Sequence, residues 1–166
     1  MKRALPPDIR LVAALLLLAV AAVAQGIEDR DFDAVADFSV NVKTLSQLDE
    51  EAAGAYGILD RFLLLDGTVT NIIVLDSKEE SFLAQVELVY GEWIGLEEVR
   101  SYSCWVMFSG PRFFPVFPPR VPRNPPPGII QANDRVLVVA KALQLVEIDG
   151  GEKVWVLQGV HARTLH

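Results

Sequence analysis

Few of the side chains that most often carry out catalysis occur in this chain of 166 residues. It has one cysteine, Cys104, and two histidines, His161 and the C-terminal His166. One internal histidine and one cysteine make a zinc site only if several carboxylates join them, and no ligand spacing suggests this. The sequence also lacks a nucleophile elbow, a phosphate-binding glycine loop and a dinucleotide fingerprint. We therefore expect no metal, no cofactor and no enzymatic activity.

The carboxylates of 76–98 are the one group with catalytic potential. A pair of carboxyl groups at the right separation hydrolyses glycosidic bonds. Most of these acids fall in predicted turns, where solvated surface charge is the simpler interpretation. The alternative function that stays open is a small exported hydrolase that acts on envelope sugars with two of them. They are Asp76, Glu79, Glu80, Glu87, Glu92, Glu97 and Glu98.

The segment 109–128 combines residue types that bind partners. It holds eight of the ten prolines, which remove backbone donors and stiffen an extended loop. No acidic residue occurs between Glu98 and Asp134, although the whole chain has a net charge of −7. Arginine and aromatic side chains dominate binding hot spots. We therefore predict partner contacts here, with two floor residues on the preceding strand. The predicted set is Arg112, Phe113, Phe114, Phe117, Arg120 and Arg123, with Tyr102 and Trp105 as the floor.

Alternating or continuous apolar patterns predict the strands that must position this segment. They cover 62–75, 81–90, 98–108, 135–148 and 152–165. The last two flank a glycine pair that is typical of a tight hairpin. Five strands in this order resemble an OB-fold, a small Greek-key barrel in which a helix commonly links the third and fourth strands. The resemblance covers 62–165 and rests on strand order and spacing, without a family motif, and a proline-rich loop replaces the helix. A small β-sandwich is the alternative.

Details of these elements lead to further expectations. Gln85 and Glu87 lie on the wet face of the strand 81–90, and Gly67 marks a bulge or bend in the first long strand. Trp93, in a glycine-flanked loop, is either a lid over the core or an exposed anchor. Before the barrel, alternating apolar residues predict a half-buried strand at 38–42. A helix-start pattern and a helical apolar face predict one short helix over 46–56.

The first 24 residues have the order of a secretory signal peptide. Basic residues precede the apolar run 11–24, which ends in a small-residue exit at Ala22-Val23-Ala24. The run is short for a membrane span, which takes roughly 20 residues, and this favours a signal peptide. A membrane anchor is the alternative. We therefore expect an exported protein, periplasmic or extracellular. Its domains would be the leader 1–24, an acidic segment 25–61 with one strand and a short helix, and the barrel 62–166.

Removal of the leader makes the chain more acidic. It takes away Lys2, Arg3, Arg10 and Asp8, which leaves 12 basic and 21 acidic residues in 142, a net charge of −9. Phosphate backbones repel such a domain, so we do not expect nucleic acid as a partner. A lone Cys104 in an apolar run forms no internal disulfide and is expected to be a buried thiol.

These observations favour a binding module over an enzyme. The first hypothesis is an exported, non-catalytic binding or structural module of the cell envelope, which contacts a partner protein or a small ligand through 109–128. The phenylalanines of that segment could instead plug the open end of the barrel and leave the arginines in water. A third hypothesis, nucleic-acid binding through the barrel and its basic loop, predicts steeply salt-dependent binding. The acidic charge and the leader argue against it.

Overall fold

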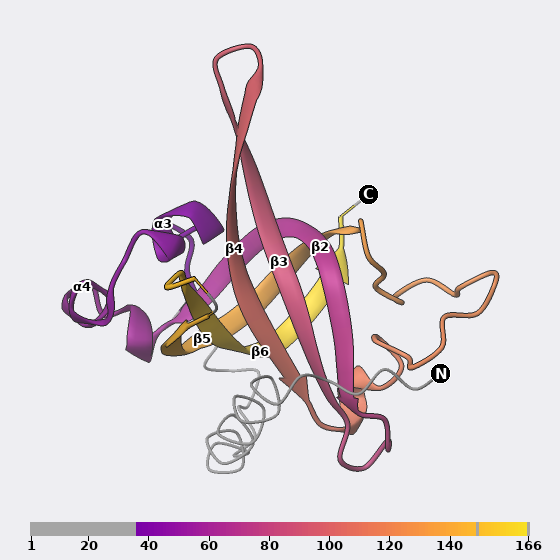
Figure 1. Cartoon of the computed structure of the whole chain (residues 1–166). Coiled ribbons are helices and arrows are strands. Elements are labelled where there is room, and N and C mark those ends of the chain that lie inside the picture. The colour runs from indigo at the N-terminus through magenta and orange to yellow at the C-terminus, as the bar shows by residue number, and fades with distance from the viewer. Residues whose placement is uncertain (1–35, 149, 166) are drawn as a thin grey trace. The chain divides into compact units, whose positions relative to one another are not determined.

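The computed structural model describes residues 36–148 and 150–165. Five long strands dominate it, and short helices lie before and between them (Figure 1). The predicted leader and the start of the acidic segment fall outside the described residues. In chain order the elements are β1 (Ala36–Asp37), α3 (Val42–Ser46), α4 (Glu50–Ala55), η2 (Ile58–Asp60), β2 (Phe62–Asp76), β3 (Leu83–Ile94), β4 (Glu98–Ser109), η3 (Pro111–Phe113), β5 (Arg135–Glu147) and β6 (Lys153–Thr164).

The five long strands close into a ring. The order across the sheet is β1-β2-β3-β4-β6-β5, and β5 pairs back with β2. All neighbours in the ring are antiparallel except β4 and β6, which are parallel. A five-stranded meander whose last hairpin closes onto both its third and its first strand is the OB-fold. The predicted fold class is confirmed, and the closing β2–β5 ladder rules out a sandwich of two separate sheets.

The barrel interior follows from the alternation of side chains along each strand. On β3, Ala84, Val86 and Leu88 are buried in the core, while Gln85 and Glu87 between them are partly exposed. The same period brings Leu63 and Leu65 of β2 and the equivalent residues of β4, β5 and β6 into one apolar cluster. The predicted wet face of β3 is therefore the outer face of the barrel.

The proline-rich segment plugs one end of this barrel. Phe113 and Phe117 are buried, and their rings lie 4.9 and 4.7 Å from that of Phe108 on β4. The backbone N–H of Ile130 donates to the carbonyl of Val116 and ties the returning chain to the plug. This part of the loop therefore takes the place of the helix that usually links these two strands.

The other end is covered by the short helices, whose prediction was partly wrong. The predicted strand 38–42 is absent, and Val42 instead begins α3. The side chain of Asn41 caps α3 by accepting from the N–H of Thr44, and the side chain of Asp49 caps α4 in the same way. The predicted helix 46–56 is shortened to α4, which begins after the Asp49 cap, and α3 lies almost entirely before it. A hydrogen bond joins this helical segment to β6: the indole N–H of Trp155 donates to the carbonyl of Leu48 at 3.0 Å.

Candidate functional site

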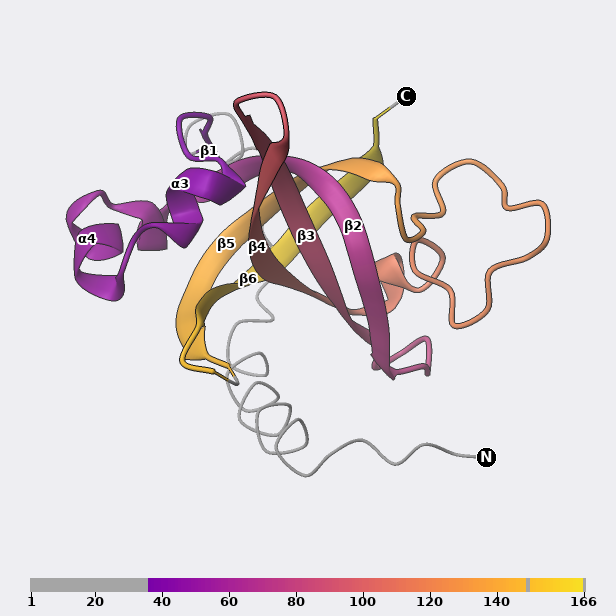
Figure 2. The ribbon, with the colours of Figure 1, turned by 45° about the horizontal axis from the view of Figure 1, so that its top comes forward.

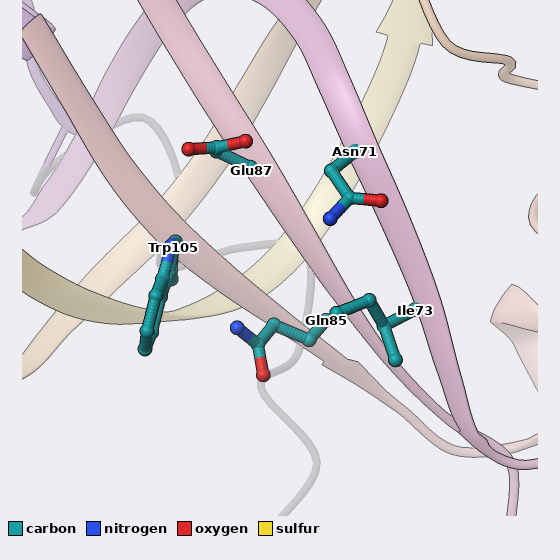
Figure 3. A pocket seen from close by; sticks show the side chains of 5 residues that line it. All are labelled: Asn71, Ile73, Gln85, Glu87 and Trp105. Atoms are coloured by element: carbon teal, nitrogen blue, oxygen red, sulfur yellow. The ribbon is translucent and has the colours of Figure 1, made fainter. Parts of the chain in front are cut away.

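A shallow pocket lies on the outer face of the barrel, across β2, β3 and β4 (Figure 3). Strand register brings its walls together, because Glu87 pairs with Trp105 on one side and with Asn71 on the other. Two residues further along the same face, Gln85 lies opposite Ile73. The pocket has a volume of about 120 Å³ and an open mouth. It therefore joins one indole, one aliphatic side chain, two amides and one carboxylate.

A β-bulge in β2 puts Asn71 into this pocket. Val69 is buried in the core, and in a regular strand a residue two positions later would face the same way. The register shifts between Val69 and Asn71, so Thr70 is the extra residue and Asn71 turns outward. The hydroxyl of Thr70 donates to the Glu87 carboxylate at 2.6 Å. The bulge predicted at Gly67 was therefore misplaced by three residues.

Gly67 has a different role from the one predicted. A Cβ there would lie 2.8 Å from the Leu88 side chain and 3.0 Å from the carbonyl oxygen of Val89. Glycine is needed at this position because β3 approaches the backbone of β2 closely. This close approach holds β2 against β3 at the start of the outer face.

The arginines of the proline-rich segment are exposed, whereas its phenylalanines are not. Arg112 packs over the Phe113 ring, with its guanidinium carbon 4.7 Å from the ring centroid. Arg120 and Arg123 lie in the exposed stretch of the loop, which lies beside β2 in both views (Figures 1 and 2). Phe114 is half-buried, with its ring edge-on to Phe82 at 5.8 Å. Partner contact through the predicted set stays a prediction. Of its loop residues, only the three arginines have exposed side chains.

The two predicted floor residues lie on opposite faces of β4. Trp105 lines the outer pocket, whereas Tyr102 faces α3 and donates to Glu92 at 3.3 Å. Glu92 also pairs with Lys43 at 2.7 Å. The hydrogen bond with Lys43 lowers the pKa of Glu92, and the same bond raises the pKa of Lys43. Tyr102 therefore helps to hold the hairpin base against α3 and is not part of the pocket.

The carboxylates proposed for a hydrolase do not form a site. Asp76 is engaged by Ser81 and by the backbone of Lys78, and Glu92 is engaged by Lys43. Glu97 and Glu98 lie at the far tip of the β3–β4 hairpin. Among the described residues, no three histidine, cysteine or acidic side chains gather as metal ligands. Asp76 and Glu92 are therefore each held by neighbouring groups of the fold.

Cys104 is fully buried, as predicted. Burial is the main cause that raises the pKa of its thiol to about 12, so the thiol stays protonated and unreactive. His161 is an exposed strand residue. Among the described residues, no helix is long and apolar enough to cross a membrane.

The sequence pointed to part of this pocket. Alternation along β3 identified Gln85 and Glu87 as outward-facing, and Trp105 was selected as a floor residue. Asn71 and Ile73 were missed because the bulge at Thr70 reverses the inside-outside pattern of β2 beyond that point. The local signal that could have shown this reversal is the pair of adjacent polar residues Thr70 and Asn71, which interrupts the alternation of polar and apolar residues.

Comparison with known proteins gives no family for the chain. No protein-family model matches it, and no curated protein is similar in sequence. Solved structures are similar at low identity. PriB from Ralstonia solanacearum is 12% identical over 63% of this chain and 97% of its own, with a TM-score of 0.38. A Plasmodium falciparum SSB in complex with ssDNA is 11% identical over 63% and 94%, with a TM-score of 0.41. The mitochondrial single-stranded DNA binding protein Rim1 from S. cerevisiae is 12% identical over 63% and 93%, with a TM-score of 0.37.

These comparisons contradict four expectations. The similar structures include a mitochondrial single-stranded DNA binding protein and an SSB with ssDNA. The exported envelope module, the periplasmic or extracellular location and the exclusion of nucleic acid are therefore wrong, as is the alternative hydrolase. Export was inferred from residues 1–24, which lie outside the described part of the chain. Nucleic acid was excluded on net charge, which takes no account of where charges lie on the surface.

Proposed function

We propose that this OB-fold binds single-stranded nucleic acid across the outer face of β2, β3 and β4, as a binding module without catalysis. The observation that carries the proposal is the outer pocket, where the Trp105 indole lies beside hydrogen-bonding side chains on the sheet face. The strand 2–3 face of OB-folds is a common platform for oligonucleotides. In this chain β2, β3 and β4 are the first three strands of the ring, so the pocket occupies that position.

The side chains of the pocket are suited to bases more than to phosphates. An aromatic ring on such a face stacks a base without regard to its identity, and this is worth about 1–3 kcal/mol per base. The amides of Asn71 and Gln85 can donate to and accept from base edges. The Glu87 carboxylate accepts from exocyclic amino groups and repels phosphate. We therefore place bases against the sheet and the sugar-phosphate backbone away from Glu87.

The arginines of the proline-rich segment supply the positive charge that the face itself lacks. Arg112, Arg120 and Arg123 are exposed, and no acidic residue follows Glu98 until Asp134. Phosphates lying toward this loop would avoid Glu87 and contact arginine. A duplex keeps its bases stacked and paired, so stacking on Trp105 favours a single strand. We expect binding to weaken as salt is raised, because each contact between an arginine and a phosphate releases a counterion.

The test is the affinity of the full chain for a fluorescently labelled oligothymidine, measured by anisotropy at low salt. Trp105→Ala is expected to weaken binding roughly 10- to 100-fold, the equivalent of one lost stacked base. Tyr56→Ala is the control, since Tyr56 is an exposed aromatic residue outside the pocket and outside the β3–β4 hairpin, and this variant should bind like the unchanged protein. Circular dichroism confirms that both variants are folded.

A salt series tests the arginines separately. For single strands the slope of log affinity against log salt is about −0.7 per phosphate contact, so three contacts give roughly −2. Arg120→Ala should reduce this slope by about 0.7. The proposal fails if the unchanged protein binds no oligonucleotide at low salt, or if Trp105→Ala binds as tightly as the unchanged protein.

A further inference from the structure

The β3–β4 hairpin ends in an exposed apolar tip. Trp93 is 71% exposed, Leu96 is 96% exposed, and Ile94 and Val99 are 36% and 47% exposed. The strands stay paired up to the last rung, Ile94 opposite Glu98, so the tip is a regular extension of the barrel. It projects beyond the ring of strands (Figure 1). Clustered exposed apolar side chains of this kind mark interaction sites.

Charge restricts what this tip can bind. Glu97 and Glu98 are exposed in the turn and carry negative charge next to Leu96. Phosphate backbones are repelled there, so the tip does not extend the nucleic-acid face. Two tips are also repelled by each other, because the same acids would meet. The partner surface must therefore be apolar and basic.

The chain carries one segment of this description. The stretch 118–127 of the proline-rich loop exposes Arg120 and Arg123 with Val121 between them, and Val121 is 45% exposed. Prolines stiffen this stretch, which reduces the entropy lost when it is bound. In both views the hairpin tip and this stretch lie on different sides of the barrel (Figures 1 and 2). A contact between them therefore needs two molecules.

We propose that the chain self-associates head to tail, with the acidic apolar tip of one protomer docked on residues 118–127 of a second copy. The two surfaces are complementary in charge and share apolar character. They are different patches of the molecule, so the contact is heterologous and builds rings or open chains. Each patch is small, so the association is weak and reversible. Arg120 and Arg123 serve in both proposals, so self-association and single-strand binding compete for this loop, and association is tested without nucleic acid.

The test is sedimentation velocity of the full chain over a wide concentration range at low salt, without nucleic acid. The mean mass is expected to rise with concentration and to fall again when salt is raised, because the contact is partly electrostatic. Trp93→Ala should weaken association roughly 30-fold, as expected for an aromatic side chain that becomes buried in the contact between two protomers. A protein that stays monomeric at every concentration at low salt overturns the proposal.

A charge-swap experiment identifies the contact. Variant A carries Glu97→Lys and Glu98→Lys, and variant B carries Arg120→Glu and Arg123→Glu. All four residues are exposed, so both variants are expected to fold. Each variant alone should be monomeric, because its tip and its loop then carry like charges. An equal mixture of A and B should associate again, because each tip meets a loop of opposite charge.

A matched control distinguishes this contact from a general effect of charge. Glu79→Lys with Glu80→Lys changes an exposed acidic pair in the β2–β3 turn by the same amount, and it should associate like the unchanged protein. The proposal is overturned if variants A and B associate alone like the unchanged protein, or if their mixture remains monomeric.

Discussion

Gly159 of β6 is expected to be one of the most sensitive positions of the barrel. A Cβ at this position would overlap the ring of Phe108, with the ring atoms Cε1, Cδ1 and Cζ all closer than van der Waals contact. Phe108 is fully buried, and its ring already packs against those of Phe113 and Phe117. Gly159→Ala therefore forces the Phe108 ring to move within a buried cluster that already contains the rings of Phe113 and Phe117.

The magnitude follows from overpacking. Inserting a methyl group into a filled core costs about 1–3 kcal/mol. Replacing glycine restricts the unfolded chain and returns about 0.4–1 kcal/mol. We expect a net loss of roughly 1–2 kcal/mol, which corresponds to a fall in Tm of roughly 3–8 °C for a domain of this size.

The assay is reversible chemical denaturation of the unchanged protein and two glycine variants, followed by far-UV circular dichroism. Gly54→Ala is the matched control: this exposed glycine lies inside α4 and has no atom within 4 Å of an added Cβ. It should stabilise the protein by about 0.5–1 kcal/mol. Adding Phe108→Leu to Gly159→Ala should recover part of the loss, because it removes the clashing ring. A Gly159→Ala variant as stable as the unchanged protein would refute the reasoning.

Three further outcomes are expected. Phe117→Ala should cost about 3–5 kcal/mol in denaturation, because a buried ring of the plug is lost. The Lys43–Glu92 pair should stabilise the folded protein at neutral pH. The hydrogen bond with Lys43 lowers the pKa of Glu92 in the folded protein, so this stabilisation is lost as the pH falls through the lowered pKa. Lys43→Ala should flatten that acid dependence, and an unchanged pH profile would contradict it. Cys104 should resist a thiol reagent in the native protein and react only after unfolding, because burial keeps the thiol protonated.

Local pattern was sufficient to predict most of the barrel. Alternation with a period of two identifies a half-buried strand wherever it occurs, and the five predicted strands match β2 to β6 to within a few residues. The turn between the last two strands was also predicted, since Gly150 and Gly151 both have positive φ. β3 runs further than predicted, through Trp93, because pairing with β4 continues across the glycine at 91.

Local pattern misled where tertiary contacts compete with it. Val40 and Val42 alternate like a strand, yet the Asn41 cap and burial of Val42 and Leu45 over the barrel end make this segment a helix. In the described part of this segment, only Ala36 and Asp37 pair with a strand, β2, and the pairing ends before Val40. The apolar residues have the same burial to gain in either form, so the packing surface decides between strand and helix.

The sequence by itself determined the order of the strands, the inner and outer faces of β3 and the concentration of basic charge in 109–128. Only the tertiary structure decided which of these residues meet. Strand register brought Trp105 beside Glu87, and the bulge at Thr70 turned Asn71 toward them. Closure of the ring made an interior that Phe113 and Phe117 fill, which left the arginines outside. Register and closure depend on contacts between distant parts of the chain, and a local pattern carries no information about them.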